Sequence, residues 1–131
     1  EPFLISSATN LILAQRLARK ICKDCKEEVR LPPQAFIDIG VLPNDVKTMK
    51  CFKGKGCTTC NGSGYKCIIA LYEVMPLTDS LKELVLNGAS SAELKRGAIK
   101  EGMKSLRMSG ITKIKEGVTT MEEVVRATMA D

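Results

Sequence analysis

The segments Cys22-Lys23-Asp24-Cys25 and Gly56-Cys57-Thr58-Thr59-Cys60-Asn61-Gly62-Ser63-Gly64 decide how this chain folds. Each contains a C-x2-C pair, and 31 residues separate the two pairs. Two such pairs are the usual means of placing four sulfur atoms tetrahedrally around one zinc ion. The chain contains no histidine, so mixed Cys/His ligand sets are excluded. We therefore predict a zinc site formed by Cys22, Cys25, Cys57 and Cys60.

The predicted zinc is structural, because four thiolates leave no open coordination position for water. Sites of this kind bind zinc with apparent free energies of about 10–16 kcal/mol in small peptides. We expect zinc removal to unfold residues 22–64 while the helical tail survives. The alternatives are disulfide or redox chemistry and inert thiols. The paired spacing favours metal, in a lysine-rich chain long enough to build a core without crosslinks.

The composition is typical of a soluble globular protein, with 44% hydrophobic and 27% charged residues among 131. No apolar run approaches the roughly 20 residues that a membrane-spanning helix needs, so we expect no membrane insertion. No segment has the pattern of a signal peptide. The chain opens at Glu1 in mid-pattern, and we interpret it as a piece of a longer protein.

The formal net charge is +5. A tetracysteine zinc site would reduce it to about +3, since the thiolates add −4 and the ion adds +2. Nearby lysines either balance this anionic cluster or form a basic patch for nucleic acid; they are Lys20, Lys23, Lys26, Lys53, Lys55 and Lys66. Aromatic residues make up only 4%, and tryptophan is absent. Few aromatic side chains are therefore available to stack on nucleic-acid bases, and we expect no nucleic-acid partner.

Hydrophobic spacing predicts a helix over residues 6–21 that leads into Cys22, with Ser6 or Ser7 as its cap. Its apolar stripe consists of Leu11, Ala14, Leu17, Ala18 and Ile21. Pro33 is expected to start a short helix that Gly40 ends, and residues 43–45 a further turn. Residues 49–53 and 65–74 are predicted strands, the second of them buried.

Capping signals and glycine stops predict four helical elements after Pro76. They are a helix capped by Thr78 and closed by Asn87-Gly88, a helix from a Ser90/Glu93 capping box to about Glu101, a segment over 103–116, and a helix from a Thr119/Glu122 capping box that includes Met129. Gly110 lies inside the third, where glycine costs a helix about 1 kcal/mol relative to alanine. The predicted fold class is α+β, mostly α: a tetracysteine zinc knuckle with a short β-hairpin over 22–75, then a helical bundle over 76–131.

No catalytic group is evident. Gly54-Lys55-Gly56 lacks the frame of a phosphate-binding loop, and without histidine no Ser-His-Asp or Cys-His pair can form. Cys51 and Cys67 fall on the predicted strands, and we expect them to be buried hydrophobic side chains. Their alternatives are a substitute metal ligand or a redox pair across strands.

Several segments together resemble one protein family. They are Glu1-Pro2-Phe3-Leu4, residues 14–19 (Ala-Gln-Arg-Leu-Ala-Arg), Cys22 to Cys25, Gly56 to Tyr65, residues 70–74 (Ala-Leu-Tyr-Glu-Val), Glu101-Gly102-Met103, Ser105-Leu106 and residues 117–120 (Gly-Val-Thr-Thr). The chain resembles, over essentially its full length, the C-terminal part of the secretion ATPases that assemble type IV pili or drive type II secretion. The pilus-assembly (extension) ATPases are the closer match and the type II secretion ATPases the runner-up.

The resemblance implies more than the residues themselves. Members are bacterial, cytoplasmic, magnesium-dependent homohexameric ATPases with a RecA-like core, and they act on an inner-membrane platform protein. Residues 1–21 would be the end of that core, and the four cysteines would bind zinc. The nucleotide-binding motifs would lie upstream, so ATP and Mg2+ would bind only in the parent protein. The chain alone would be no enzyme.

One departure from the family pattern follows Gly64-Tyr65-Lys66. There the family usually has Gly-Arg, and this chain has Cys67-Ile68. The change removes a permissive backbone position and a positive charge, and it adds a sulfur near the knuckle.

Two readings from other classes remain beside the family: a free-standing zinc-ribbon adaptor for nucleic acid or protein, and a thiol–disulfide protein that uses its C-x2-C pairs.

Overall fold

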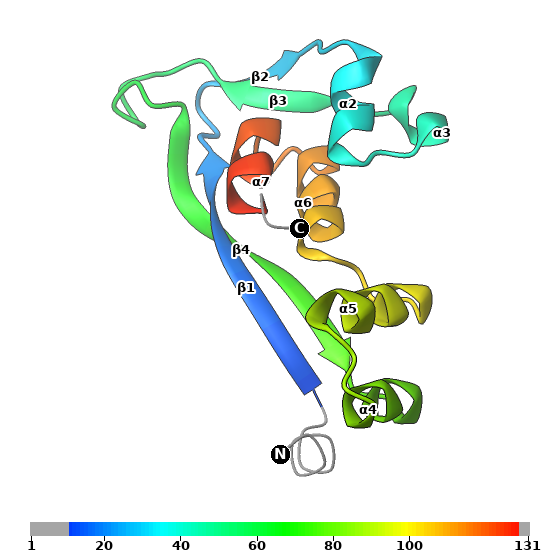
Figure 1. Ribbon diagram of the computed structural model, residues 1–131. Coiled ribbons are helices and arrows are strands. Elements are labelled where there is room, and N and C mark those ends of the chain that lie inside the picture. Colours follow the sequence, from blue (N-terminus) through cyan, green and yellow to red (C-terminus); the bar gives the residue numbers. More distant parts are fainter. Residues whose placement is uncertain (1–10, 129–131) are drawn as a thin grey trace. The chain divides into compact units, whose positions relative to one another are not determined.

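The computed structural model describes residues 11–128 (Figure 1). Its elements are β1 (Leu11–Ile21), β2 (Lys26–Val29), α2 (Pro33–Ile39), α3 (Pro43–Val46), β3 (Cys51–Gly54), β4 (Tyr65–Pro76), α4 (Asp79–Leu86), α5 (Ser91–Lys100), α6 (Leu106–Lys115) and α7 (Met121–Ala127). Over this range the strands form two two-stranded sheets, β1–β4 and β2–β3. The fold is therefore mixed α/β, as the sequence predicts. None of the described helices has the length and apolar character that crossing a membrane requires.

The chain forms two compact units, each with its own core. Among the described residues, the larger unit contains 15–71 and 106–128, and the smaller contains 11–14 together with 72–105. Helices α6 and α7 pack together in the larger unit, whereas α4 and α5 pack together in the smaller one. The expectation of one C-terminal helical bundle was therefore wrong, because the two helix pairs bury their apolar faces in different cores. The sequence-based boundaries at 21/22 and 75/76 stay a prediction.

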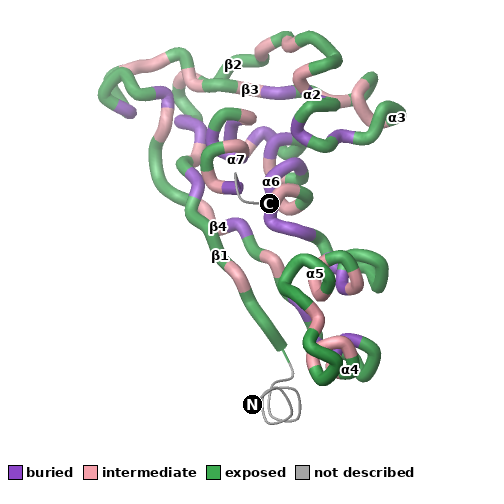
Figure 2. Tube along the Cα trace, in the orientation of Figure 1, coloured by how far each residue is buried: buried purple, intermediate pink, exposed green. Residues whose placement is uncertain are grey.

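The core of the larger unit joins α2, β3, α6 and α7 (Figures 1 and 2). It consists of Phe36, Ile39, Val41, Cys51, Ile111, Ile114 and Val124. Burying one such side chain fully stabilises a fold by about 1.5–3 kcal/mol. Two of these core residues, Phe36 and Ile39, lie on helix α2. As predicted, α2 starts at Pro33 and is ended by Gly40, which has a φ of 107°. The same core supports the β2–β3 ribbon, because α6 contacts β3.

The β2–β3 ribbon lies between the two cysteine pairs. Its strands are antiparallel, with Lys26 opposite Gly54 and Val29 opposite Cys51. β3 confirms the strand expected near residues 49–53. Sequence reasoning missed β2, because its Lys-Glu-Glu-Val sequence carries no alternating apolar pattern. Pairing with β3 imposes the extended conformation there.

The helix predicted over residues 6–21 is wrong, since residues 11–21 form strand β1. The helical stripe is not a buried face: Leu11 and Leu17 are each 54% exposed, and only Ala18 and Ile21 of the stripe are buried. Backbone pairing with β4 outweighs the intrinsic helix preference, which is a weak prior. Ser6 and Ser7, the expected caps, lie outside the described residues.

β4 confirms the predicted second strand and extends it to Pro76. Its burial was predicted wrongly, because Ile68, Tyr72 and Val74 are exposed and only Leu71 and Met75 are buried. Alternating apolar residues indicate a strand, but a two-stranded sheet leaves much of its surface open to solvent. Figure 2 shows β1 and β4 largely as exposed segments.

The helices of the smaller unit begin as their capping signals predict. Thr78 Oγ1 accepts a hydrogen bond from the Leu81 backbone N–H at the start of α4. Ser90 Oγ accepts one from the Glu93 backbone N–H at the start of α5, and the Ser90 hydroxyl also bonds the Glu93 carboxylate. Their core consists of Met75, Leu77, Leu81, Ala98 and Met103.

Helix α7 begins one residue later than the sequence predicts. Its cap is Thr120, whose hydroxyl accepts a hydrogen bond from the Glu123 backbone N–H, and not Thr119 with Glu122. Both registers fit the local sequence Thr-Thr-Met-Glu-Glu. Tertiary contacts decide between them, because the Thr119 hydroxyl donates instead to the Arg19 carbonyl oxygen at 2.7 Å. Met129 lies outside the described residues.

Candidate metal centre

The four predicted cysteine ligands converge at one point in the larger unit. Their sulfur atoms all lie within 4.8 Å of one another. The Sγ–Sγ distances are 3.7 Å for Cys22–Cys57, 3.7 Å for Cys57–Cys60 and 3.8 Å for Cys25–Cys60. A tetrahedral site with Zn–S bonds of about 2.3 Å requires sulfur separations of about 3.8 Å. The four cysteines are thus positioned to hold a metal ion, and their spacing suits zinc.

Two turns bring the pairs together. Cys22 directly follows β1 and Cys25 directly precedes β2, while the second pair lies in the loop between β3 and β4. Backbone hydrogen bonds join the turns: the Cys22 N–H donates to the Gly64 carbonyl oxygen at 3.0 Å, and the Lys55 N–H donates to the Cys25 carbonyl oxygen at 2.9 Å. The fold therefore holds the ligands together through strand ends and not through the sulfur atoms alone.

Backbone amides point at the sulfur atoms, as a site for thiolates requires. Cys60 Sγ accepts hydrogen bonds from the N–H groups of Cys57 at 3.3 Å and Gly64 at 3.2 Å, and Cys25 Sγ accepts one from Gly56 at 3.3 Å. Burial by itself would raise the pKa of Cys60, but hydrogen bonds from the Cys57 and Gly64 amides and from the Cys57 and Cys25 side chains outweigh it and lower the pKa to about 6. Burial instead raises the pKa of the neighbouring Cys25 to about 12. The donor set of soft, hydrogen-bonded sulfurs thus fits zinc.

Glycine is required where the two segments approach most closely. A Cβ on Gly54 would collide with the carbonyl oxygen of Gly64, and a Cβ on Gly64 would lie 2.5 Å from that of Gly54. Gly64 also has a φ of 81°, which side-chain-bearing residues rarely adopt. Gly54 and Gly64 therefore serve the backbone geometry of the second cysteine pair.

The two spare cysteines differ from each other. Cys51 is buried in the core, with 3% of its surface exposed, as expected. Cys67 is exposed, so its expected burial was wrong. Its backbone has a φ of 72°, a conformation uncommon for any residue except glycine. The structure thus accounts for the glycine that the family resemblance leads one to expect there.

A second cluster, which sequence reasoning missed, lies next to the metal centre. We call it the Glu123 cluster; it contains Arg19, Tyr65, Thr120, Glu123 and Arg126. The buried Glu123 carboxylate accepts hydrogen bonds from the Arg19 backbone N–H at 2.9 Å and from Arg19 Nε at 2.8 Å. Arg126 Nε donates to it at 2.7 Å. The Arg126 and Arg19 hydrogen bonds outweigh burial and lower the pKa of Glu123 to about 2.

Aromatic contacts complete the Glu123 cluster. The Arg19 guanidinium lies 4.1 Å from the centre of the Tyr65 ring, and the Tyr65 hydroxyl is 2.8 Å from Thr120 Oγ1. The cluster thereby joins α7 to β1 just before Cys22. The paired acids Glu122 and Glu123 were its only signal in the sequence, and that signal does not reveal which of the two is buried.

The fold and site define a mixed α/β protein with a tetracysteine cluster positioned to hold a metal ion. The sequence model of the family described as "Type II/IV secretion system protein" matches residues 1–126. The chain therefore belongs to that family, as the sequence resemblance indicates.

Curated relatives of this chain include type IV pilus assembly ATPases and type II secretion system proteins. The chain is 54% identical over 132 residues to the type IV pilus assembly ATPase PilB of Myxococcus xanthus, which covers 100% of this chain and 23% of that protein. It is 38% identical over 129 residues to PilB of Thermus thermophilus, covering 98% and 14% of the two chains. It is 39% identical over 128 residues to the type II secretion system protein E of Pseudomonas aeruginosa, covering 98% and 25%. The chain thus spans a quarter or less of the length of these relatives.

Proposed function

We propose that this chain is the zinc-binding C-terminal part of an ATPase that powers type IV pilus assembly. The observation that carries the proposal is the convergence of four cysteine sulfurs, within 4.8 Å, in a chain 54% identical to a pilus assembly ATPase. Cys22, Cys25, Cys57 and Cys60 would hold one zinc ion. A closed shell of four thiolates supplies no catalysis, so the role of the ion is to crosslink two chain turns.

The parent protein would supply the motor activity. We propose that it binds ATP and Mg2+ through residues upstream of this chain, assembles as a homohexamer and acts on a platform protein at the cytoplasmic side of the inner membrane. This chain would contribute structure and contact surfaces but no catalytic residue. The names of the relatives support the ATPase activity, and the family resemblance supports the assembly and the partners.

Type II secretion is the second candidate for the parent. It is favoured by the 39% identity to the type II secretion system protein E of Pseudomonas aeruginosa. The two candidates predict the same metal site and differ in the exported subunit. Deleting the parent gene and scoring surface pili and secreted proteins separately distinguishes them.

The metal role is tested with Cys57→Ser in the full-length parent, because serine keeps the size of the side chain and removes a ligand. We expect zinc content to fall from one ion per chain to well below one, and pilus assembly to be lost. The nucleotide site should remain able to bind ATP. Cys67→Ser is the matched control, since Cys67 is exposed and outside the four-sulfur cluster. Normal zinc content and normal piliation in Cys57→Ser would exclude the proposal.

A further inference from the structure

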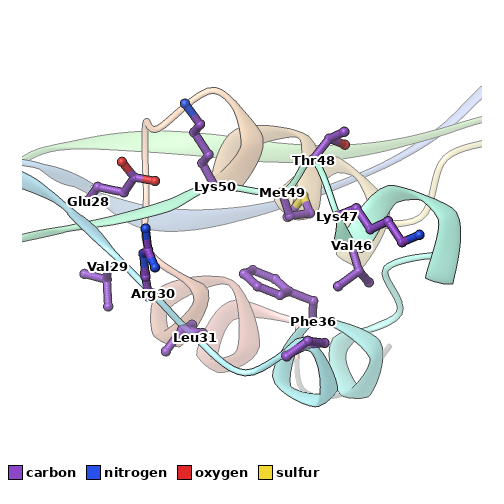
Figure 3. Close-up of a pocket in the computed structure, with 11 residues that line it drawn as sticks. Glu28, Val29, Arg30, Leu31, Phe36, Val46, Lys47, Thr48, Met49 and Lys50 are labelled. Atoms are coloured by element: carbon purple, nitrogen blue, oxygen red, sulfur yellow. The ribbon is translucent and has the colours of Figure 1, made fainter.

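A groove of about 330 Å³ lies in the larger unit, between the end of β2 and the segment that leads into β3 (Figure 3). The β2–β3 ladder ends at the pair Val29–Cys51. Beyond that pair the two strands separate, and residues 30–31 and 46–50 line the groove together with the start of α2. Its volume falls in the usual range for binding pockets, about 300–1,000 Å³.

The floor of the groove is apolar. The Phe36 ring belongs to the buried core, and partly buried Val29, Leu31, Val46 and Met49 pack against that core. Figure 3 shows Phe36 and Val46 pointing into the space between the two segments. A floor of this kind favours burial of an apolar side chain, because burial removes apolar area from water.

The rim of the groove is positively charged. Arg30, Lys47 and Lys50 line it and are exposed, against a single carboxylate, Glu28. None of the three cations forms an ion pair with another residue in the part of the chain that the structure describes, whereas nearby Lys53 and Lys115 do. Three free cations around an apolar floor complement a ligand that carries acidic groups beside an apolar anchor.

We propose that this groove binds a short acidic peptide segment of a partner protein, with one aromatic or large aliphatic side chain buried among the partly buried floor residues Val29, Leu31, Val46 and Met49. The flanking Asp or Glu side chains of the peptide pair with Arg30, Lys47 and Lys50. A nucleic acid matches the groove less well, because its only aromatic side chain, Phe36, is 4% exposed and offers no stacking face.

The test is peptide binding to the 131-residue chain, kept in zinc-containing buffer and followed by amide chemical shifts. The probe is the peptide Asp-Glu-Phe-Glu-Asp. Its controls are Asp-Glu-Ala-Glu-Asp, Lys-Lys-Phe-Lys-Lys and a single-stranded thymidine oligonucleotide. We expect the probe to shift amides of residues 28–31 and 46–50, and to bind at least tenfold tighter than each control. Added salt should weaken its binding.

Charge-reversal variants test whether the probe binds the rim residues themselves or responds only to the overall charge of the chain. Arg30→Glu combined with Lys50→Glu should weaken probe binding about tenfold or more. Arg96→Glu, an exposed cation on α5, should leave it unchanged. The proposal is overturned if millimolar probe shifts no groove amide, if the lysine peptide or the oligonucleotide binds there equally well, or if both charge variants behave alike. None of these residues is a predicted metal ligand, so the outcome is independent of the zinc proposal.

Discussion

Glu123 holds the C-terminal helix to the strand that leads into the metal centre. Its side chain is 2% exposed and contacts two arginines whose own side chains are about half exposed, Arg19 at 54% and Arg126 at 56%. A buried carboxylate is tolerable only when its charge is compensated, and four hydrogen bonds from these arginines compensate it here. We therefore expect this residue to contribute more to stability than the exposed ion pairs of the described residues.

We predict that Glu123→Gln destabilises the chain by about 2–4 kcal/mol near neutral pH, because it removes the charge from a buried, charge-assisted network. The folded pKa of about 2 lies below the ordinary 4.5. The stabilisation is therefore present above pH 4.5 and is lost as pH falls toward 2. Denaturant unfolding of both proteins across this range measures it. The difference in free energy of unfolding between wild type and Glu123→Gln should shrink on acidification. Any loss of metal in acid affects both proteins, so it does not contribute to this difference.

Glu122→Gln is the matched control for that experiment, since the neighbouring Glu122 is exposed. It should change the free energy of unfolding by less than about 0.5 kcal/mol. A difference between wild type and Glu123→Gln that stays constant with pH would contradict the assigned role of the carboxylate.

Cys67 occupies a backbone conformation that suits glycine, with a φ of 72°. Such conformations cost other residues about 1–3 kcal/mol, while glycine costs about 0.5–1 kcal/mol in lost chain entropy. We therefore predict that Cys67→Gly raises the free energy of unfolding by about 1 kcal/mol. Cys67→Ser, which keeps the Cβ, should produce no gain. Equal thermal midpoints for the two variants would show that the backbone is not strained there.

At the scale of elements, the close packing of α6 on α7 explains Gly110. A Cβ at this position would lie 2.5 Å from Val124 Cγ1, and Val124 is completely buried. Glycine in a helix interior ordinarily weakens the helix, so the sequence alone presents Gly110 as a defect. The packing shows instead that the absence of a side chain lets the two helices meet.

We predict that Gly110→Ala destabilises the chain by up to about 2 kcal/mol, since an overpacking cost of about 1–3 kcal/mol is offset by a helix gain of about 1 kcal/mol. The control is a double-mutant cycle with Val124→Ala, which removes the colliding methyl groups. The cost of Gly110→Ala should largely disappear in that background. Stabilisation by Gly110→Ala alone would exclude the close contact.

At the scale of the whole molecule, the four tail helices belong to two different cores. Helices α6 and α7 share the core of the larger unit with α2 and β3, whereas α4 and α5 have a core of their own. Loss of the metal centre should therefore reach α6 and α7 through the shared core, and should leave α4 and α5 folded. This replaces the simpler expectation that the whole tail survives.

Amide hydrogen exchange before and after chelation tests this expectation. We predict lost protection in residues 22–64 and in α6 and α7, and retained protection in α4 and α5. Returning zinc should restore the original pattern, which serves as the control for irreversible damage. Unchanged protection across the two cysteine pairs would show that the metal does not stabilise this fold.

The sequence alone determined the features that depend on local chemistry. The paired spacing of Cys22, Cys25, Cys57 and Cys60 identified the four sulfurs that converge, and the caps at Thr78 and Ser90 located two helix starts. The caps succeeded because a cap is set by residues a few positions apart. The cysteines succeeded because two C-x2-C pairs are a specific ligand pattern, even with 31 residues between them. The metal itself and its role in the parent protein stay predictions.

Only the tertiary structure decided the features that depend on distant partners. It made residues 11–21 a strand, placed the cap of α7 at Thr120 and buried Glu123 between two arginines. It also divided the four tail helices between two cores. Local patterns cannot specify these outcomes, because the contacts that decide them join residues far apart in the sequence, such as Arg19 and Glu123, which are 104 positions apart. The energy of those contacts exceeds the small differences in local preference.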